Sequence, residues 1–206
     1  MGHYFINDDN LKSDIKEYQT KFENRLFKFK TDNGVFSKGE LDFGSYLLIS
    51  TVLKEKIGGN VLDLGCGYGV IGIILNKLRN VYVDLIDVNK RAIHLTKLNI
   101  VDNECSNINC FLSDGYENID KKYNIIISNP PIRIGKEKLY NLIITSKEYL
   151  LDNGKIYLVI RKEQGAKSFI KDMEKYYKIE ILEKKKGFFV ICLKLYWLLL
   201  KNVLLI

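Results

Sequence analysis

Glycines cluster after one carboxylate near residue 63, and they are the strongest chemical signal in the sequence. Asp63 lies at the end of an apolar stretch, and Gly65, Gly67 and Gly69 follow it at every second position. Glycines let the backbone approach a ligand where a Cβ atom would clash. Read from Gly67, the turn also fits GxGxxG, a dinucleotide-binding pattern that is weak on its own. Asp63 would repel a pyrophosphate here, so the turn favours a cationic or zwitterionic ligand.

Two further carboxylates follow apolar stretches in the same way. Asp87, with Val88 behind it, lies 22 residues after Gly65. That spacing is typical of an acidic residue that accepts both hydroxyls of a ribose at a neighbouring strand end. Asp114 and Gly115 follow the next stretch. Because parallel strands end at the sheet edge where open α/β folds bind ligands, the carboxylates are expected to meet at one site. The alternative for Asp87 is that it only caps the next helix.

The most specific motif is Asn129-Pro130-Pro131, which contains the only two prolines of the 206 residues. Proline fixes φ and lacks an N–H group, so the backbone here offers a rigid carbonyl acceptor with no competing donor. The side chain of Asn129 adds a second carbonyl oxygen. Two such acceptors can hold an –NH2 group by both hydrogens and direct its lone pair toward the glycine-rich turn. The alternative is a plain turn with a capping asparagine.

The cysteines do not form a pattern typical of a metal site. Cys66, Cys105, Cys110 and Cys192 include no CxxC pair, and no histidine or aspartate cluster flanks them. We therefore expect no metal, no disulfide framework and reduced thiols. The first residues have neither a basic nor an apolar signal region, which predicts a cytoplasmic protein.

The elements that position these residues alternate between short β-branched stretches and helical patterns from about residue 60 onward. This alternation is typical of βαβ units and a mostly parallel sheet. Strands are expected at Asn60–Leu64, Val81–Ile86, Ile108–Leu112, Tyr123–Ser128, Lys155–Ile160, Lys178–Glu183 and Phe188–Leu195. Helices are expected after the N-cap Asp42 through Lys56, and at Val70–Arg79, Asn89–Asn103, Lys136–Leu151 and Gln164–Tyr177.

We expect a single domain over residues 1–195, because no Pro/Ser-rich linker interrupts the chain. Residues 1–40 are expected to form an N-terminal extension of it, which is irregular over residues 1–35 except that Arg25–Lys30 alternates like a strand. Residues 196–206 form an apolar tail without an assigned role. The stretch Gly187–Ile206 is about long enough to span a bilayer, but Lys194 and Lys201 interrupt it, so no membrane association is expected.

The charge balance is basic. Lys and Arg number 32 against 25 Asp and Glu, which gives a net charge of +7, and the isoelectric point is about 9.0. This excess fits a polyanionic partner such as RNA, although biased codon usage also enriches lysine. The stretch Arg161–Lys186 holds nine basic against five acidic residues, so it is a candidate for phosphate contacts.

The successive motifs resemble those of class I S-adenosylmethionine-dependent methyltransferases that methylate amino groups. The runs Gly34–Lys38, Leu41–Ser45 and Asn129–Lys136 are similar to the small-subunit ribosomal RNA guanine-N2 methyltransferase family, in its short single-domain form. The resemblance covers roughly Tyr4 to Lys194. It implies an α/β, Rossmann-like fold. Its seven-stranded, mostly parallel sheet has an antiparallel last strand and helices on both faces.

The resemblance also implies a cofactor, S-adenosylmethionine, and a role for each motif. The glycines pass beneath the amino-acid portion of the cofactor and Asp63 attracts its ammonium group, while Asp87 holds the ribose and Asp114 the adenine. The implied cofactor site consists of Asp63, Gly65, Gly67, Gly69, Asp87, Val88, Asp114, Gly115 and Asn129. The implied catalytic motif is Asn129, Pro130 and Pro131, which holds the target amine.

Ribosomal RNA is the implied partner, and residues around the catalytic motif are candidates for binding it. They are Phe36, Ile132, Arg133 and Lys136. Many relatives carry an aromatic residue where this chain has Ile132, so Phe36 or Phe43 is expected to stack on the extruded base instead.

Three alternatives share part of this pattern. The same two acceptors would also hold adenine N6 or the side-chain amide of a protein glutamine. A non-catalytic RNA-binding factor for ribosome assembly would keep the basic surface without using the acceptors. A nicotinamide oxidoreductase fits less well, since the Asn129 motif has no part in hydride transfer.

Overall fold

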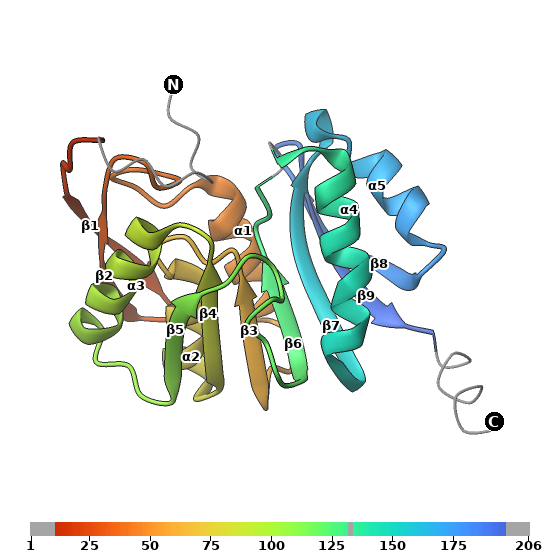
Figure 1. Ribbon diagram of the computed structural model, residues 1–206, viewed down its shortest axis with the longest axis horizontal. Helices are drawn as coiled ribbons and strands as arrows, with labels where there is room; N and C mark the ends of the chain where they lie inside the picture. The colour runs from red at the N-terminus through yellow and green to blue at the C-terminus, as the bar shows by residue number, and fades with distance from the viewer. Residues whose placement is uncertain (1–10, 132–133, 197–206) are drawn as a thin grey trace.

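The strands of the main sheet run through the middle of the molecule, with helices on both faces (Figure 1). The computed structural model describes residues 11–131 and 134–196. The sheet has seven strands in the order β5-β4-β3-β6-β7-β9-β8. These strands are β3 (Asn60–Leu64), β4 (Tyr82–Asp87), β5 (Ile108–Leu112), β6 (Tyr123–Ser128), β7 (Leu150–Arg161), β8 (Tyr177–Lys185) and β9 (Phe188–Leu195).

Strand directions agree with the fold expected from the sequence. Strands β5, β4, β3, β6 and β7 pair in parallel. The last strand, β9, lies antiparallel between β7 and β8, and the short turn before it lets it form a hairpin with β8. The Rossmann-like, mostly parallel sheet with an antiparallel last strand is thereby confirmed.

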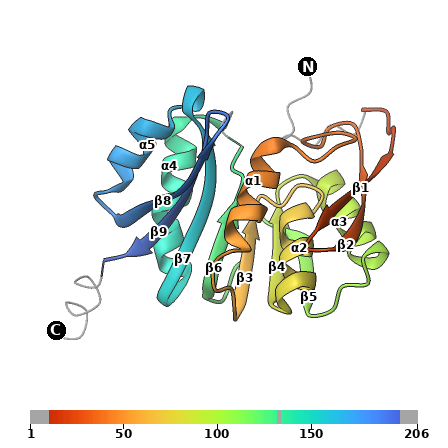
Figure 2. The ribbon, with the colours of Figure 1, turned by 180° about the vertical axis from the view of Figure 1, so that it is seen from behind.

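Two apolar cores lie on the two faces of the sheet. Helices α1 (Phe43–Val52), α2 (Val70–Arg79) and α3 (Lys90–Asp102) contribute to one core, and α4 (Lys136–Thr145) and α5 (Ala166–Met173) to the other. In the view from behind, α1 and α2 lie in front of the sheet, on the face opposite to α4 and α5 (Figure 2). On β3, Val61 belongs to the first core while Leu62 and Leu64 belong to the second, which is the alternation of a pleated strand.

A separate two-stranded hairpin packs beside α3. It consists of β1 (Lys16–Phe22) and β2 (Arg25–Thr31). Asn99 of α3 and Asn103, the C-cap of α3, bond the backbone of β2. Asn99 Oδ1 accepts from Lys30 N at 2.7 Å, and Asn103 Oδ1 accepts from Lys28 N at 3.1 Å. These amides satisfy strand edge groups that would otherwise lack partners. The sequence indicated β2, but β1 was expected to be irregular, because Lys, Glu and Gln alternate with only a few apolar residues there.

Some boundaries differ from those expected. The helix expected over Lys136–Leu151 ends at Thr145, is followed by a 3-10 turn at Ser146–Tyr149, and gives way to β7 at Leu150. Leu150 is buried and pairs with Tyr123 of β6, so its burial favours strand over a longer helix. Within the described residues, no helix is long and apolar enough to cross a membrane.

Candidate active site

A cavity of about 1030 Å³ lies at the C-terminal ends of β3, β4, β5 and β6. This is the edge at which open α/β sheets bind ligands. Most of the residues singled out from the sequence line it, and they are Phe36, Gly65, Gly67, Asp87, Val88, Asp114, Gly115, Asn129, Pro130 and Pro131. The cavity therefore brings together the glycine-rich turn and the proline motif.

The glycine-rich turn after β3 is held by backbone hydrogen bonds. The N–H groups of Gly65 and Cys66 both donate to Ile86 O at 2.9 Å. Gly65 has φ of +73° and Gly67 has φ of +58°, a left-handed backbone that only glycine adopts at little cost. A Cβ atom at Gly67 would meet nothing within 4 Å. Gly67 therefore leaves the adjoining part of the cavity open to a ligand.

Gly69 has a different role from the other two glycines. It has φ of +89°, and a Cβ atom there would lie 2.8 Å from Thr96 Cγ2. The described residues of the cavity wall do not include it. Gly69 therefore lets the turn pack against α3, and its implied place beneath the cofactor stays a prediction.

Asp63 lies beneath the turn and not on the described wall of the cavity. Its side chain is fully buried, and Oδ2 accepts from Gly72 N at 2.8 Å. Asp63 shares the strand face of Val61, which points to α2, and the attraction of the cofactor's ammonium group that the resemblance implies for it stays a prediction. Oδ1 has no hydrogen-bond partner in the described part of the chain. Burial raises the pKa of this carboxyl to about 7, opposed by the Gly72 N–H bond and increased by the charge of Asp87.

Asp87 ends β4 at the edge of the cavity. Its Oδ2 accepts from Gly67 N at 2.9 Å and its Oδ1 accepts from Asn89 N at 2.8 Å. Burial raises the pKa of Asp87, while N–H donors from Asn89, Gly67 and Val88 oppose the shift. The carboxylate thus joins the glycine turn to the start of α3, and its remaining lone pairs are available to a ligand.

Asp114 and Gly115 follow β5 on the far side of Asp87. Asp114 is exposed, and Ser113 N donates to Asp87 O at 3.1 Å, which keeps the two strand ends together. Gly115 has φ of +56°, and a Cβ atom there would lie 3.0 Å from Leu142 Cδ1. The loop after β5 therefore passes close to α4 and closes this end of the cavity.

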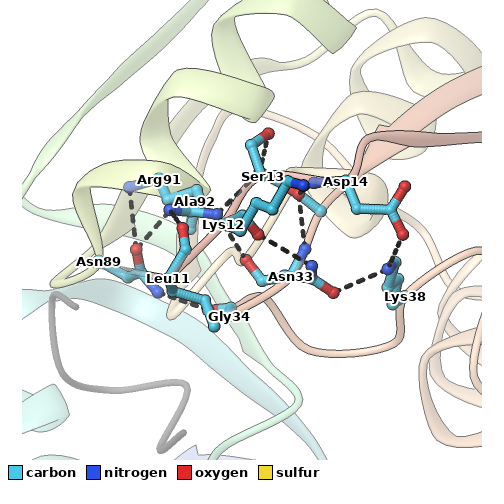
Figure 3. A network of polar contacts seen from close by, with 11 residues as sticks. Leu11, Lys12, Ser13, Asp14, Asn33, Gly34, Lys38, Asn89, Arg91 and Ala92 are labelled. Atoms are coloured by element: carbon cyan, nitrogen blue, oxygen red, sulfur yellow. Dashed lines mark hydrogen bonds and ion pairs between the residues drawn. The ribbon is translucent and has the colours of Figure 1, made fainter. Parts of the chain in front are cut away.

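A segment of the N-terminal extension is fastened over the start of α3 (Figure 3). Asn89 Nδ2 donates to Gly34 O at 2.9 Å. Arg91 donates to Asn33 O at 3.2 Å and to Leu11 O at 2.6 Å, and it pairs with the buried Asp32 at 3.0 Å. These contacts hold the loop that carries Phe36 to the cavity, where its ring is 49% exposed.

Aromatic and basic side chains also gather beside the cavity. Phe43 and Phe188 both line it, with ring centroids 5.6 Å apart. The Lys186 ammonium lies 4.8 Å from the Phe43 ring centre and the Arg161 guanidinium 5.4 Å from that of Phe188. Sequence reasoning did not place Phe188 here, because the β8–β9 turn brings it to the cavity from far along the chain.

The Asn129 motif begins where β6 ends. Ser128 Oγ donates to Leu64 O at 2.6 Å, which ties β6 to the end of β3. Asn129 Nδ2 donates to Ser45 Oγ at 2.9 Å and to Asp42 Oδ1 at 3.3 Å. Pro131 approaches the glycine turn, because a Cβ atom at Gly65 would lie 3.9 Å from Pro131 Cδ. The two motifs therefore belong to one site.

The residues expected to bind substrate divide into three groups. Phe36 lines the cavity. Lys136 points away from the described wall, since it pairs with Asp172 at 3.3 Å and lies over the Tyr140 ring. Lys138, two positions along the helix, lines the cavity instead. Ile132 and Arg133 lie outside the described residues.

Asp42 and Ser45 are site residues that the sequence interpretation missed. Asp42 was identified only as the N-cap of α1, a role that the structure confirms, since its Oδ1 accepts from Ser45 N at 3.0 Å. Both residues line the cavity. Across residues 11–131 and 134–196, no group of three or more His, Cys, Asp or Glu residues is arranged to hold a metal ion.

Comparison with protein families gives a match over most of the chain. The family described as methyltransferase small domain matches residues 26–192. A protein of Bacillus subtilis (strain 168) named uncharacterized protein YbxB is 37% identical over 193 residues, which cover 92% of this chain and 96% of that protein. Ribosomal RNA small subunit methyltransferase C of Psychromonas ingrahamii is 39% identical over 153 residues. That match covers 72% of this chain but 43% of the relative, so the chain spans less than half the length of that protein.

Comparison with solved structures identifies the same fold. A 16S rRNA N2 guanine methyltransferase of T. thermophilus, RsmC, in complex with AdoMet and guanosine, matches with a TM-score of 0.79 and 21% identity. The match covers 88% of this chain and 51% of that one. A methyltransferase from Pyrococcus furiosus matches with a TM-score of 0.64 and 19% identity, over 73% of this chain and 82% of that one.

Proposed function

Because the chain belongs to the methyltransferase small domain family, we propose that it methylates an exocyclic amine of a nucleobase, namely guanine N2 in small-subunit ribosomal RNA. S-adenosylmethionine is the methyl donor. The observation that carries the proposal is that the glycine turn and the Asn129 motif line one cavity. The names of the methyltransferase C relatives and the guanosine bound to the T. thermophilus protein support guanine as the base.

The residues on the glycine side fit the cofactor, which supplies an electrophilic methyl group on a sulfonium when it is bound. Gly65 and Gly67 have no Cβ atom to obstruct its amino-acid portion. Asp87 offers carboxylate oxygens to the ribose hydroxyls, and Asp114, at the end of β5, lies where the adenine amine is expected. Asp63 is buried below the turn, so when ionised it acts on the ammonium group through its field and not by contact.

The residues on the proline side fit the amine. The Oδ1 atom of Asn129 and the carbonyl oxygen of Pro130 accept one hydrogen each from the –NH2 group, which counters delocalisation of the nitrogen lone pair into the ring. Holding the nitrogen in line with its reaction partner supplies most of the acceleration, up to about 7–11 kcal/mol. Because the amine loses its proton after it has become cationic, no strong general base is needed before attack. The site accordingly relies on acceptors instead of a histidine.

The rim of the cavity fits a polyanion that carries planar bases. Lys138, Arg161 and Lys186 lie in or beside the cavity wall, and Phe36, Phe43 and Phe188 present rings to it. Cations contact phosphates and aromatic rings stack on unpaired bases in proteins that bind single-stranded RNA. A paired or stacked guanine would be extruded to reach Asn129. With this partner, we retain the cytoplasmic location that the sequence predicts for the protein.

Methylation of defined RNA tests the proposal. The protein is incubated with labelled S-adenosylmethionine and small-subunit ribosomal RNA transcribed in vitro, which carries no modifications, and the nucleosides are then separated. We expect label in N2-methylguanosine. Large-subunit ribosomal RNA and ribosomal proteins serve as matched acceptors. Label in N6-methyladenosine or in protein glutamine would move the target to another amine, and RNA binding without label on any acceptor would support a non-catalytic assembly factor.

A further inference from the structure

The side chain of Asn129 reaches from the end of β6 to the first turn of α1. Its Nδ2 atom donates to Ser45 Oγ at 2.9 Å and to Asp42 Oδ1 at 3.3 Å. The same Asp42 oxygen accepts from Ser45 N at 3.0 Å, as the N-cap of α1. Ser45 is 3% exposed. The start of α1 therefore presents two oxygen atoms to one face of the amide.

An amide has two unlike ends, and its partners decide which end faces where. An ionised carboxylate only accepts hydrogen bonds, so the end of Asn129 that faces Asp42 must be the –NH2 end. The carbonyl oxygen then lies on the other side of the group. Asn129 lines the cavity, and its Oδ1 accepts no hydrogen bond from the described residues, so this oxygen is available to a bound group.

We propose that Asp42 and Ser45 are positioning residues, which fix the Asn129 amide with its Oδ1 toward the target amine. The inference rests on the proposed function, in which Asn129 Oδ1 accepts a hydrogen of that amine. The residues do not touch the reacting atoms and act only through Asn129. An N-cap and a buried hydroxyl of one helix thereby set the polarity of a side chain that lies more than eighty positions later in the sequence.

Positioning matters because the last torsion of asparagine has two broad wells. In the second well Nδ2 would point into the cavity, and a donor would then face the –NH2 group of the substrate. That arrangement repels the amine and leaves its lone pair delocalised in the ring. Two oxygens from α1 stabilise the acceptor orientation before the substrate binds, so the cost of ordering is met in folding and not in the reaction.

A double-mutant cycle between Ser45 and Asn129 tests the inference. We expect Ser45→Ala to lower kcat, at saturating cofactor and RNA, by about three- to tenfold, which is the range for one hydrogen bond. In an Asn129→Ala background the same Ser45→Ala change should leave the remaining rate within about twofold, because no amide is left to orient. The Kd of S-adenosylmethionine should stay near the wild-type value, and thermal unfolding reports on the fold of each variant.

The outcomes separate the inference from the function on which it rests. Equal losses from Ser45→Ala in both backgrounds would overturn the positioning role while leaving the proposed function intact. No loss of kcat in Asn129→Ala alone would instead overturn the proposed function. A drop in kcat for Ser45→Ala that is confined to the Asn129 background supports both.

A second pair of variants covers the case in which Ser45→Ala does not fold. Asp42→Asn and Asp42→Ser are comparable N-caps, so α1 should be equally stable in both. Asparagine keeps an oxygen at the reach of the original side chain, whereas serine is too short to contact Asn129 Nδ2. We expect the Asp42→Ser variant to lose several-fold more kcat than Asp42→Asn. Equal losses would assign Asp42 a capping role only and overturn the inference.

Discussion

The glycine turn after β3 and the Asn129 motif after β6 line the same cavity, but different interactions hold them. The turn is held through its own backbone N–H groups, because Gly65 and Cys66 both donate to Ile86 O and Gly67 donates to the Asp87 carboxylate. Asn129 is held by side chains, Ser45 and Asp42, that lie 84 and 87 positions earlier in the sequence. One wall is thus held mainly by backbone N–H groups that reach the neighbouring strand, and the other by a contact between side chains far apart in the sequence.

This difference separates affinity from rate. In the proposed function, the backbone wall, which is the glycine turn, binds the cofactor whether or not RNA is present, so changes there should alter cofactor affinity. The side-chain wall, which is Asn129 with Ser45 and Asp42, is proposed to act mainly on the target amine, so changes there should alter the methyl-transfer step. If the two walls act independently, a change in one wall should leave the quantity that depends on the other near its wild-type value.

The largest effect on the backbone wall is expected for Asp87→Ala. It removes a charged acceptor for the ribose hydroxyls, so the binding free energy of S-adenosylmethionine should weaken by about 1.5–3 kcal/mol, the range for hydrogen bonds to charged groups. The Kd should therefore rise about 10- to 150-fold. Calorimetric titration of the free protein measures it. Asp87→Asn keeps one acceptor oxygen and serves as the matched control, with a smaller loss. An unchanged Kd in Asp87→Ala would remove this residue from the cofactor site.

The glycines should separate into a ligand position and a packing position. A non-glycine residue in the left-handed region costs roughly 1–2 kcal/mol, and Gly69→Ala adds a clash with Thr96 Cγ2 at 2.8 Å. We expect Gly69→Ala to unfold at a lower temperature than Gly67→Ala, and Gly67→Ala to lose more cofactor affinity, since its Cβ enters open space. Thermal unfolding and calorimetry measure the two effects, and a reversed order in either would show that the glycines have been assigned the wrong way round.

Asp63 should make stability depend on pH. Its folded-state pKa is raised to about 7, chiefly by burial, so its protonated form stabilises the fold at low pH and this contribution is lost as the pH rises through 7. Between pH 6 and pH 8 the free energy of unfolding of the ligand-free protein should fall by about 1.4 kcal/mol from this group. Denaturant unfolding at the two pH values measures the change. Asp63→Asn cannot ionise and should reduce the pH dependence by that amount, whereas an identical dependence in both proteins would contradict the raised pKa.

The smallest effect is expected at the rim of the side-chain wall. Lys186→Ala should flatten the slope of log affinity against log salt for RNA by about 0.7, the value for one lost phosphate contact with a single strand. Lys178→Ala is the matched control, because Lys178 lies near the start of β8, at the sheet edge opposite the cavity. Equal slopes in both variants would place the RNA path away from the β8–β9 turn.

The local features of the site were predictable from the sequence. Gly65, Gly67 and Asp87 were identified because a strand, a turn and a helix follow one another within a few residues, and adjacent parallel strands end at the same edge. The bounds of β3, β5, β6 and β9 agree with those expected, because each is a short stretch rich in apolar residues. Asp63 lies on the face of β3 that packs toward α2, which the sequence did not specify, because the face of a strand residue depends on which core it enters. Its implied cofactor role stays a prediction.

The long-range features were not predictable in the same way. No local pattern indicates that Asp42 and Ser45 contact Asn129, since the N-cap signal at Asp42 is complete without that contact. In the sequence, Arg161–Lys186 is one basic stretch. The fold places Arg161 and Lys186 beside the cavity, whereas Lys178 lies at the other end of β8. Lys136 and Lys138 are equivalent in the sequence. Only the packing of α4 against α5 shows that Lys136 forms an ion pair with Asp172.

The measurement that tests the division between the walls most directly is made on Asn129→Ala. Its cofactor Kd and its kcat at saturating cofactor are compared with those of the wild-type protein. We predict a Kd within about twofold of wild type and a kcat lower by about 10²-fold, as for removal of one preorganised polar group from an active site. Lost cofactor binding with intact turnover at saturating cofactor would contradict the account and place Asn129 in the cofactor pocket.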